Sequence, residues 1–162
     1  MKKIGIVMGS ASDLPVVQKA VDTLKEFGVP YEVHIYSAHR TPAEAGLFAR
    51  DAEKNGFGVL IAAAGMAAHL AGAIAAQTTL PVIGIPCMSN TLGGIDALLS
   101  TVQMPSGIPV ATVAVNGGVN AALLSVQILA LSDAGLTDRL KKKRQADAEA
   151  VLEKDAEIAS RL

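Results

Sequence analysis

Short strand-like segments alternate with longer helix-like segments along this chain, and that alternation limits the folds open to it. The five strand-like segments lie at residues 4–8, 31–36, 59–64, 81–86 and 110–115. The first is a continuous apolar run, which is typical of a strand that is buried on both faces of a parallel sheet. A turn rich in Gly, Ser, Asp, His or Asn follows each segment, and a helix is expected after each turn.

Helix start and stop signals complete the pattern. The first four helices are expected from Pro15 to about Phe27, from Pro42 to Asn55-Gly56, from Gly65 to about Gln77, and from Gly93-Gly94 onward. The fifth is expected from Gly117-Gly118 to about Ser132. Five strand–helix units with short connections predict an α/β fold, a doubly wound parallel sheet with right-handed crossovers. We expect one domain over residues 1–162, with the five units in 1–134 and a C-terminal helical tail in 135–162.

The polar turns all fall at one edge of this predicted sheet. In doubly wound sheets, ligands bind in the crevice outside the carboxyl ends of the strands. The turns at residues 9–13, 37–40, 65–69, 89–90 and 116–120 follow strands and therefore lie at that edge. The opposite strand ends follow ordinary helix terminators. This asymmetry predicts a functional crevice.

The segment Ser-Ala-His-Arg-Thr-Pro carries the strongest functional signal. Thr41 and Glu44 have the spacing of a capping box, and Pro42 suits the first helical position. His39 and Arg40 are therefore expected at a helix N-terminus, where an anion is favoured and an unpaired cation is not. Histidine side chains titrate near neutral pH. Together these features indicate a catalytic site for a phosphorylated substrate.

Purely structural explanations compete with the functional one. Ser10, Ser12 and Asp13 can form a turn and a helix cap only. Alternatively, the serine hydroxyls and neighbouring N–H groups hold a phosphate, and Asp13 accepts hydrogen bonds from sugar hydroxyls. His39 can satisfy a local backbone group, and Arg40 can be a surface charge.

Composition restricts the partners. The chain is 51% hydrophobic and 18% charged, which favours burial of surface against copies of itself. A net charge of −1 gives no support to nucleic-acid binding, and no apolar stretch suits a membrane span. The three histidines lack metal-ligand spacing, so no metal is expected. The one cysteine, Cys87, cannot form an intramolecular disulfide and fits a reducing compartment, so a cytoplasmic location is expected.

The tail combines a basic run with an apolar stripe. Residues 141–144 are three lysines and an arginine, which we interpret as a solvated helix face. The stripe is expected to pack on the chain's own domain or on a neighbouring subunit. Its members are Leu136, Leu140, Val151, Leu152, Ile158 and Leu162.

Several segments together resemble one enzyme family. The segments MGSASD, SAHRTP, AAHLAG, VQMPSGIPVATVAV and NAALLSVQIL are similar, in order and spacing, to the bacterial N5-carboxyaminoimidazole ribonucleotide mutases of purine biosynthesis (the PurE family, class I). The resemblance covers essentially the whole chain. It implies a flavodoxin-like three-layer fold, a homo-octamer with sites at subunit boundaries, and a cofactor-free transfer of a carboxylate from an exocyclic nitrogen to a ring carbon.

The resemblance also implies residue roles. His39 matches the general acid and base of the family. Arg40 and nearby serines, including Ser10, Ser12 and Ser37, match positions on the 5′-phosphate, and Asp13 matches a ribose contact. Two further matches, Gly65 and His69, belong to the loop that closes around the reacting carboxylate.

The chain departs from the family pattern in that loop. Met66 stands where a glycine is usual, and Ala71 replaces a proline. A related carboxylase branch, which uses free carbon dioxide, resembles SAHK rather than SAHR, so Arg40 and Ala67-Ala68-His69 favour the mutase. The remaining alternative is a non-catalytic nucleotide-binding domain on the same fold.

Overall fold

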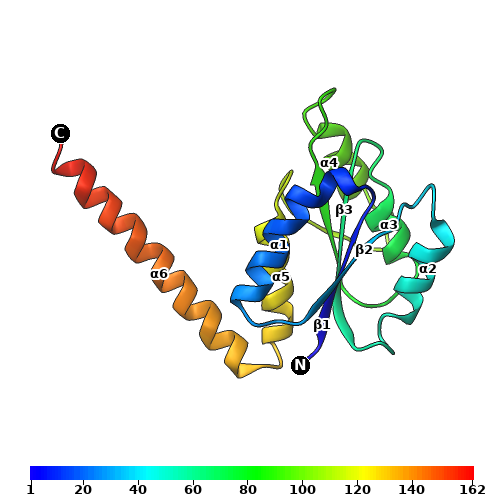
Figure 1. The fold of residues 1–162 in the computed structure, drawn as a ribbon, viewed down its shortest axis with the longest axis horizontal. Coiled ribbons are helices and arrows are strands. Elements are labelled where there is room, and N and C mark those ends of the chain that lie inside the picture. The colour runs from blue at the N-terminus through cyan, green and yellow to red at the C-terminus, as the bar shows by residue number, and fades with distance from the viewer.

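The computed structural model of the protein describes residues 1–162 and contains one five-stranded, all-parallel sheet (Figure 1). The strands are β1 (Lys3–Met8), β2 (Tyr31–Ile35), β3 (Phe57–Gly65), β4 (Val82–Cys87) and β5 (Ala111–Thr112). The helices are α1 (Leu14–Glu26), α2 (Pro42–Asp51), α3 (Leu70–Ala75), α4 (Ile95–Val102), α5 (Gly118–Ala130) and α6 (Ala134–Ala159), with a short 3-10 helix, η1 (Ala11–Asp13). The strand order β2-β1-β3-β4-β5 reverses between β1 and β3. The predicted doubly wound, flavodoxin-like fold is therefore confirmed.

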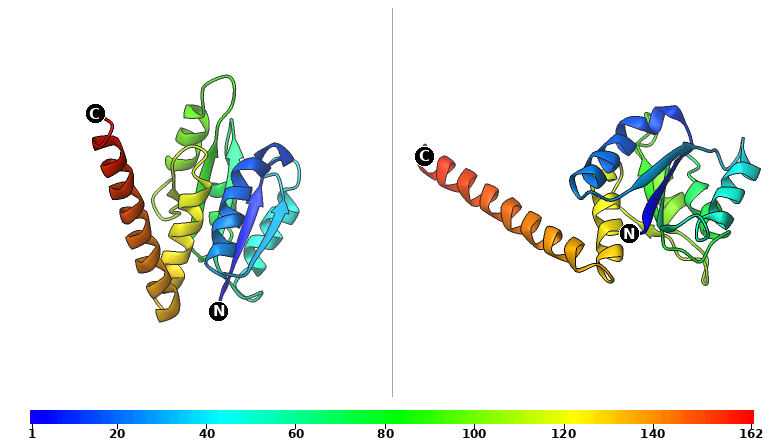
Figure 2. Two further views of the ribbon diagram at one scale, coloured as in Figure 1. Left: turned by 60° about the vertical axis from the view of Figure 1, so that its left-hand side comes forward. Right: turned by 60° about the horizontal axis from the view of Figure 1, so that its bottom comes forward.

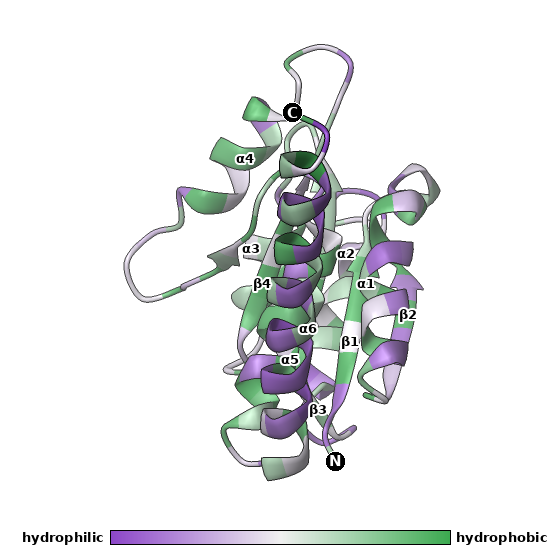
Figure 3. Ribbon diagram, turned by 90° about the vertical axis from the view of Figure 1, so that its left-hand side faces the viewer, coloured by the Kyte–Doolittle hydropathy of each residue, from purple (hydrophilic) through white to green (hydrophobic).

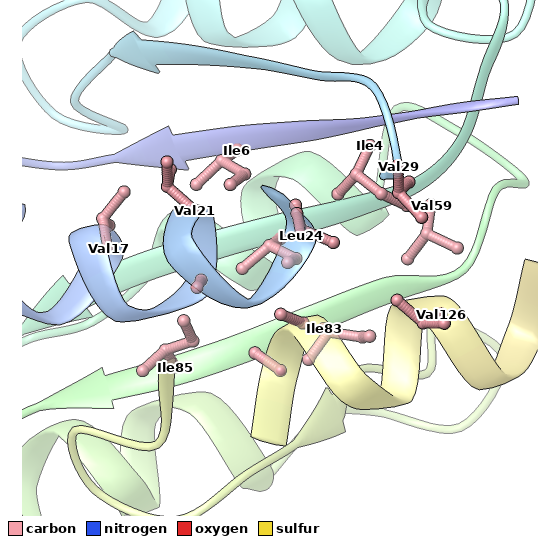
Figure 4. Packing of buried hydrophobic residues seen from close by; sticks show 14 of the residues in the cluster. Ile4, Ile6, Val17, Val21, Leu24, Val29, Val59, Ile83, Ile85 and Val126 are labelled. Carbon is pink, nitrogen blue, oxygen red and sulfur yellow. The ribbon is translucent and has the colours of Figure 1, made fainter. Parts of the chain in front are cut away.

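Helices cover both faces of the sheet. α1 and α5 pack on one face, where Ile4 and Ile6 of β1 meet Leu24 and Val126 of these helices (Figure 4). α2 and α3 pack on the other face, where Val7 points. α4 lies against β4. Neighbouring residues of β1 thus serve opposite cores, as strand geometry requires, and a continuous apolar run is the result.

The α1–α5 layer is held close by small residues. A Cβ atom at Gly118, the first residue of α5, would lie 2.2 Å from the carbonyl oxygen of Val16. Any side chain at this position would force the two helices apart. Ala121 and Ala122 continue the close contact and are fully buried.

Three predicted boundaries were wrong. α3 begins at Leu70 rather than at Gly65, because Met66 has a φ of +55° and the tight turns that follow it cannot continue as an α-helix. α2 ends at Asp51, and turns lead from there to Gly56. β5 contains two residues rather than six. It is an edge strand that pairs only with β4, through Ala111 and Thr112.

α6 leaves the body of the molecule. It starts beside α5 and then projects away from the sheet (Figures 1 and 2). Leu136 is its only buried residue, and Leu140 is partly buried against the same core. No helix of the structure has the length and apolar character that a membrane crossing needs.

Candidate active site

A cavity of about 620 Å³ opens at the carboxyl edge of the sheet. The turns after β1, β2, β3 and β4 surround it, as the crevice rule predicts. All eight residues proposed from the sequence line this one cavity: Ser10, Ser12, Asp13, Ser37, His39, Arg40, Gly65 and His69.

The turn after β1 forms the first wall. Ser10 is the N-cap of η1, because its Oγ accepts from the backbone N–H of Ser12 at 3.3 Å, and the Ser12 hydroxyl donates to the same oxygen at 2.9 Å. Ser10 therefore does cap this short helix, as its residue type predicts. Asp13 stands at the N-cap position of α1 but makes no side-chain cap hydrogen bond.

The Asp13 carboxyl lies deep in this wall and is only 9% exposed. Burial raises its pKa, although hydrogen bonds from the backbone N–H of Ser10 and from the Cys87 thiol oppose the rise. The same burial, with the Asp13 carboxylate beside it, raises the pKa of Cys87 to about 12. Cys87 therefore stays a thiol, and the Asp13 side chain lines the cavity with oxygen atoms that can accept hydrogen bonds.

The turn after β2 forms the second wall and is organised by Ser37. Its Oγ accepts from the backbone N–H of Arg40 at 3.2 Å. The Arg40 guanidinium donates through Nη2 to the carbonyl oxygen of Gly9 at 3.0 Å, which joins the first two walls. Arg40 forms no salt bridge within the chain. A fixed cation without a carboxylate partner suits an anionic group of a ligand.

The predicted capping box is wrong. Thr41 precedes α2 as expected, and Pro42 is its first residue, but Thr41 makes no side-chain cap hydrogen bond. Its Oγ1 instead accepts from the Ser37 N–H at 2.8 Å. Thr41 is thus used to shape the turn. The first N–H groups of α2 keep no side-chain partner, which leaves the helix N-terminus open to an anion.

His39 and His69 meet across the cavity. The Nε2 atom of His39 lies 2.8 Å from Nδ1 of His69, with the ring planes at 73°. One nitrogen must donate and the other accept, so the tautomers of the two rings are linked. When His39 donates, a neutral His69 carries its own proton on Nε2. The sequence placed His69 within a helix, whereas it occupies the N-cap position of α3.

Sequence reasoning left out part of the lining. Met66, Met88, Ser89 and Asn90 also line the cavity. The turn at 89–90 is predicted at the crevice because it follows a strand, and that signal is sufficient to include Ser89 and Asn90 in the site. The turn at 116–120, predicted for the same edge, does not line the cavity; Asn116 instead accepts through Oδ1 from the Met88 N–H at 2.9 Å.

The cavity walls hold no group of three or more His, Cys, Asp or Glu side chains arranged to bind a metal ion, and neither does the rest of the structure. The chemistry available from this chain's own residues is therefore that of two linked imidazoles, a fixed guanidinium, a buried carboxylate and several hydroxyls.

Comparison with known proteins agrees with this picture. The N5-carboxyaminoimidazole ribonucleotide mutase of Pyrococcus horikoshii is 56% identical over 139 residues, which are 86% of this chain and 78% of that protein. The phosphoribosylaminoimidazole carboxylase of Saccharomyces cerevisiae is 52% identical over 151 residues, 93% of this chain but only 26% of that protein. The crystal structure of Treponema denticola PurE superposes with a TM-score of 0.87 at 32% identity, covering 95% of this chain and 96% of that one. Residues 3–150 match the family described as AIR carboxylase, and the chain belongs to that family.

Proposed function

We propose that this protein is an N5-carboxyaminoimidazole ribonucleotide mutase, an isomerase of de novo purine biosynthesis that acts in the cytoplasm without a cofactor. The observation that carries the proposal is the hydrogen-bonded pair of His39 and His69 in a cavity that also holds an unpaired arginine. The 56% identity to a mutase over most of the chain supports it. The reaction moves a carboxylate from the exocyclic nitrogen to carbon 4 of the imidazole.

His39 supplies the proton transfers. As an imidazolium it protonates the carbamate nitrogen, the N–C bond breaks, and carbon dioxide and an electron-rich aminoimidazole form. The ring carbon then attacks the trapped carbon dioxide, and neutral His39 removes the proton from the resulting tetrahedral carbon. The imidazolium is regenerated, so the cycle closes. A single acid and base of this kind contributes about 10²- to 10⁴-fold, and confinement adds a proximity effect.

The other walls suit the rest of a ribonucleotide. Arg40, the serines and the open N-terminus of α2 bind the 5′-phosphate in this proposal. Asp13 accepts hydrogen bonds from the ribose hydroxyls, because an ionised carboxylate has only acceptors to offer. His69 faces the reacting carboxylate and orients His39 through their shared hydrogen bond.

A second candidate is the carboxylase reaction, in which free carbon dioxide adds to the uncarboxylated aminoimidazole ribonucleotide. The similarity to the carboxylase of Saccharomyces cerevisiae is the observation in its favour. That protein is about four times as long as the matched segment, so its name describes a larger enzyme. The segment Ala67-Ala68-His69 and Arg40 resemble the mutase pattern, and we favour the mutase.

We further propose that the protein assembles with itself, as a homo-octamer. α4 exposes an apolar face: Ile95, Leu99 and Val102, spaced four and three residues apart, are 62%, 52% and 46% exposed. The distal part of α6 exposes a second, separate apolar surface. Two independent apolar surfaces favour a closed assembly larger than a dimer.

The test compares two substrates on the purified protein and follows the ring-carboxylated product. One substrate is the carbamate nucleotide, and the other is aminoimidazole ribonucleotide with excess bicarbonate. Fast product from the carbamate alone is expected. Product chiefly from the amine would support the carboxylase, and no product from either would leave a binding domain.

A further inference from the structure

The distal half of α6, residues 147–159, and the three residues after it carry an apolar face with nothing of its own chain beneath it. Val151, Ile158 and Leu162 are 66%, 57% and 104% exposed. Val151 and Ile158 are seven residues apart and lie on one face of α6, and Leu162 follows shortly after the last residue of the helix, Ala159. Leu140 lies three full turns before Val151 on the same face, and there it packs against the core. The stripe therefore continues after the core beneath it has ended (Figures 1 and 3).

A groove of matching character lies at the elbow between α5 and α6. It has a volume of about 240 Å³. Leu131, at its edge, is 89% exposed, and Ala130 and Leu140 extend the apolar floor. Two basic side chains, Lys141 and Arg144, stand on the rim. A chain cannot fill its own groove with its own stripe, because Val151 lies about 16 Å beyond Leu140 along the helix.

Charge divides α6 into two halves. Residues 138–144 contain five basic side chains and one acidic one, whereas residues 147–161 contain five acidic and two basic side chains. Lys141 and Arg144 form no salt bridge within the chain, and neither do Glu153 and Asp155 of the distal half. The groove is thus apolar with a basic rim, and the distal stripe is apolar with acidic flanks.

We propose that the distal half of α6 of one copy lies in the α5–α6 groove of a second copy, with the two α6 helices antiparallel. Each chain carries both the groove and its occupant, and the antiparallel arrangement lets both copies make the same contact about a two-fold axis. An antiparallel arrangement brings the acidic half of each helix beside the basic half of the other. The proposal rests on the self-association proposed above and assigns one of its interfaces to named side chains.

Cross-linking between chains tests this pairing. Full-length Leu131→Cys and Val151→Cys variants are mixed and treated with a short bismaleimide. The native Cys87 is buried, and the wild-type protein measures any cross-linking that Cys87 gives. A covalent dimer is expected from the mixture. A matched mixture of Leu131→Cys and Leu47→Cys, in which Leu47 is an exposed residue of α2, is expected to give none. Absence of the first dimer, or equal yields from both mixtures, would overturn the proposal.

Charge reversal gives a second, independent test. Glu153→Lys with Asp155→Lys, or Lys141→Glu with Arg144→Glu, is expected to lower the cross-linked yield at least tenfold at low salt. All four changes on one chain restore opposite charges and are expected to restore the yield. If neither charge reversal changes the yield of the cross-linked dimer, the proposed pairing is contradicted.

Mutase activity, measured on the same samples, separates the two proposals. Activity without the cross-link argues against the pairing alone. A cross-link without activity argues against the proposed function alone.

Discussion

The cavity at the carboxyl edge of the sheet and the distal half of α6 both face solvent, yet only the cavity is organised by contacts within the chain. Ser37, Thr41 and Gly9 hold the turns around the cavity through hydrogen bonds of 2.8 to 3.2 Å. Beyond Leu140, the side-chain hydrogen bonds and ion pairs of α6 join only neighbouring turns of the helix itself, as in the Lys143–Asp147 ion pair. One chain can therefore preform the walls of the site, whereas the distal helix has no comparable packing within its own chain, and the proposed pairing supplies it from a second copy.

The largest expected effect is at the cavity. His39→Asn removes the proton carrier but keeps a polar side chain, so turnover is expected to fall about 10²- to 10⁴-fold with nucleotide binding and oligomeric state retained. Steady-state kinetics and sedimentation measure these separately. The control is His34→Asn, which alters a histidine stacked on Tyr36 away from the cavity. A His39→Asn enzyme with more than a tenth of normal turnover would contradict the assigned role.

Two leucines of α6 compare the buried start of this helix with its exposed distal half. Leu136 is fully buried, so Leu136→Ala is expected to lower the free energy of unfolding by about 2–5 kcal/mol. Leu152 is 67% exposed. Leu152→Ala is therefore expected to change the free energy of unfolding of the dissociated chain by less than about 0.5 kcal/mol. Urea denaturation at low protein concentration measures both. Similar losses would mean that the distal helix packs on its own domain.

Arg40→Ala removes charge-assisted hydrogen bonds from the proposed phosphate site. Such bonds contribute about 1.5–3 kcal/mol, so KM is expected to rise about ten- to a hundredfold while kcat changes less. Arg40→Lys keeps the charge but not the forked geometry of the guanidinium. Its KM is expected to lie between that of the wild type and that of Arg40→Ala. An effect confined to kcat would place Arg40 at the reacting atoms instead.

Substitution of Met66 tests whether the left-handed backbone at this residue is strained. A left-handed methionine costs about 1–2 kcal/mol relative to the right-handed region, and glycine relieves most of that cost. Met66→Gly is therefore expected to raise the free energy of unfolding by about 1 kcal/mol. Met88→Gly is the matched control, because Met88 also lines the cavity but has no positive φ, and this change is expected to destabilise. Equal effects would show that strain at Met66 is unimportant.

The smallest effect concerns the pH dependence that Asp13 confers. Burial raises the pKa of this carboxyl in the folded state, so its ionisation costs stability as pH rises through the folded pKa, and the cost is absent below the unfolded value near 3.8. Asp13→Asn is expected to raise Tm at pH 7, with the gain shrinking below about pH 4. An unchanged or lower Tm of Asp13→Asn at pH 7 would contradict a desolvated Asp13 carboxylate. Asp22→Asn, which alters an exposed carboxylate, is the control.

Local patterns predicted much of this molecule. Short strand-like segments located the five strands, and the rule that turns after parallel strands share an edge brought Ser10, His39 and His69 to one cavity. Local patterns failed where two local interactions compete. Thr41 has a capping sequence, but its hydroxyl bonds to Ser37 instead. Gly65 resembles a helix start, but Met66 adopts a left-handed conformation and delays α3 to Leu70.

The sequence by itself determined the order of strands and helices, the edge at which the polar turns lie, and the apolar and charged halves of α6, because these depend on side-chain type and spacing. Only the tertiary structure decided that His39 and His69, thirty residues apart, share a hydrogen bond. It alone decided that the stripe of α6 runs past the core. Both outcomes depend on distances that close only when the sheet forms and the crossovers fix where each turn and helix lies.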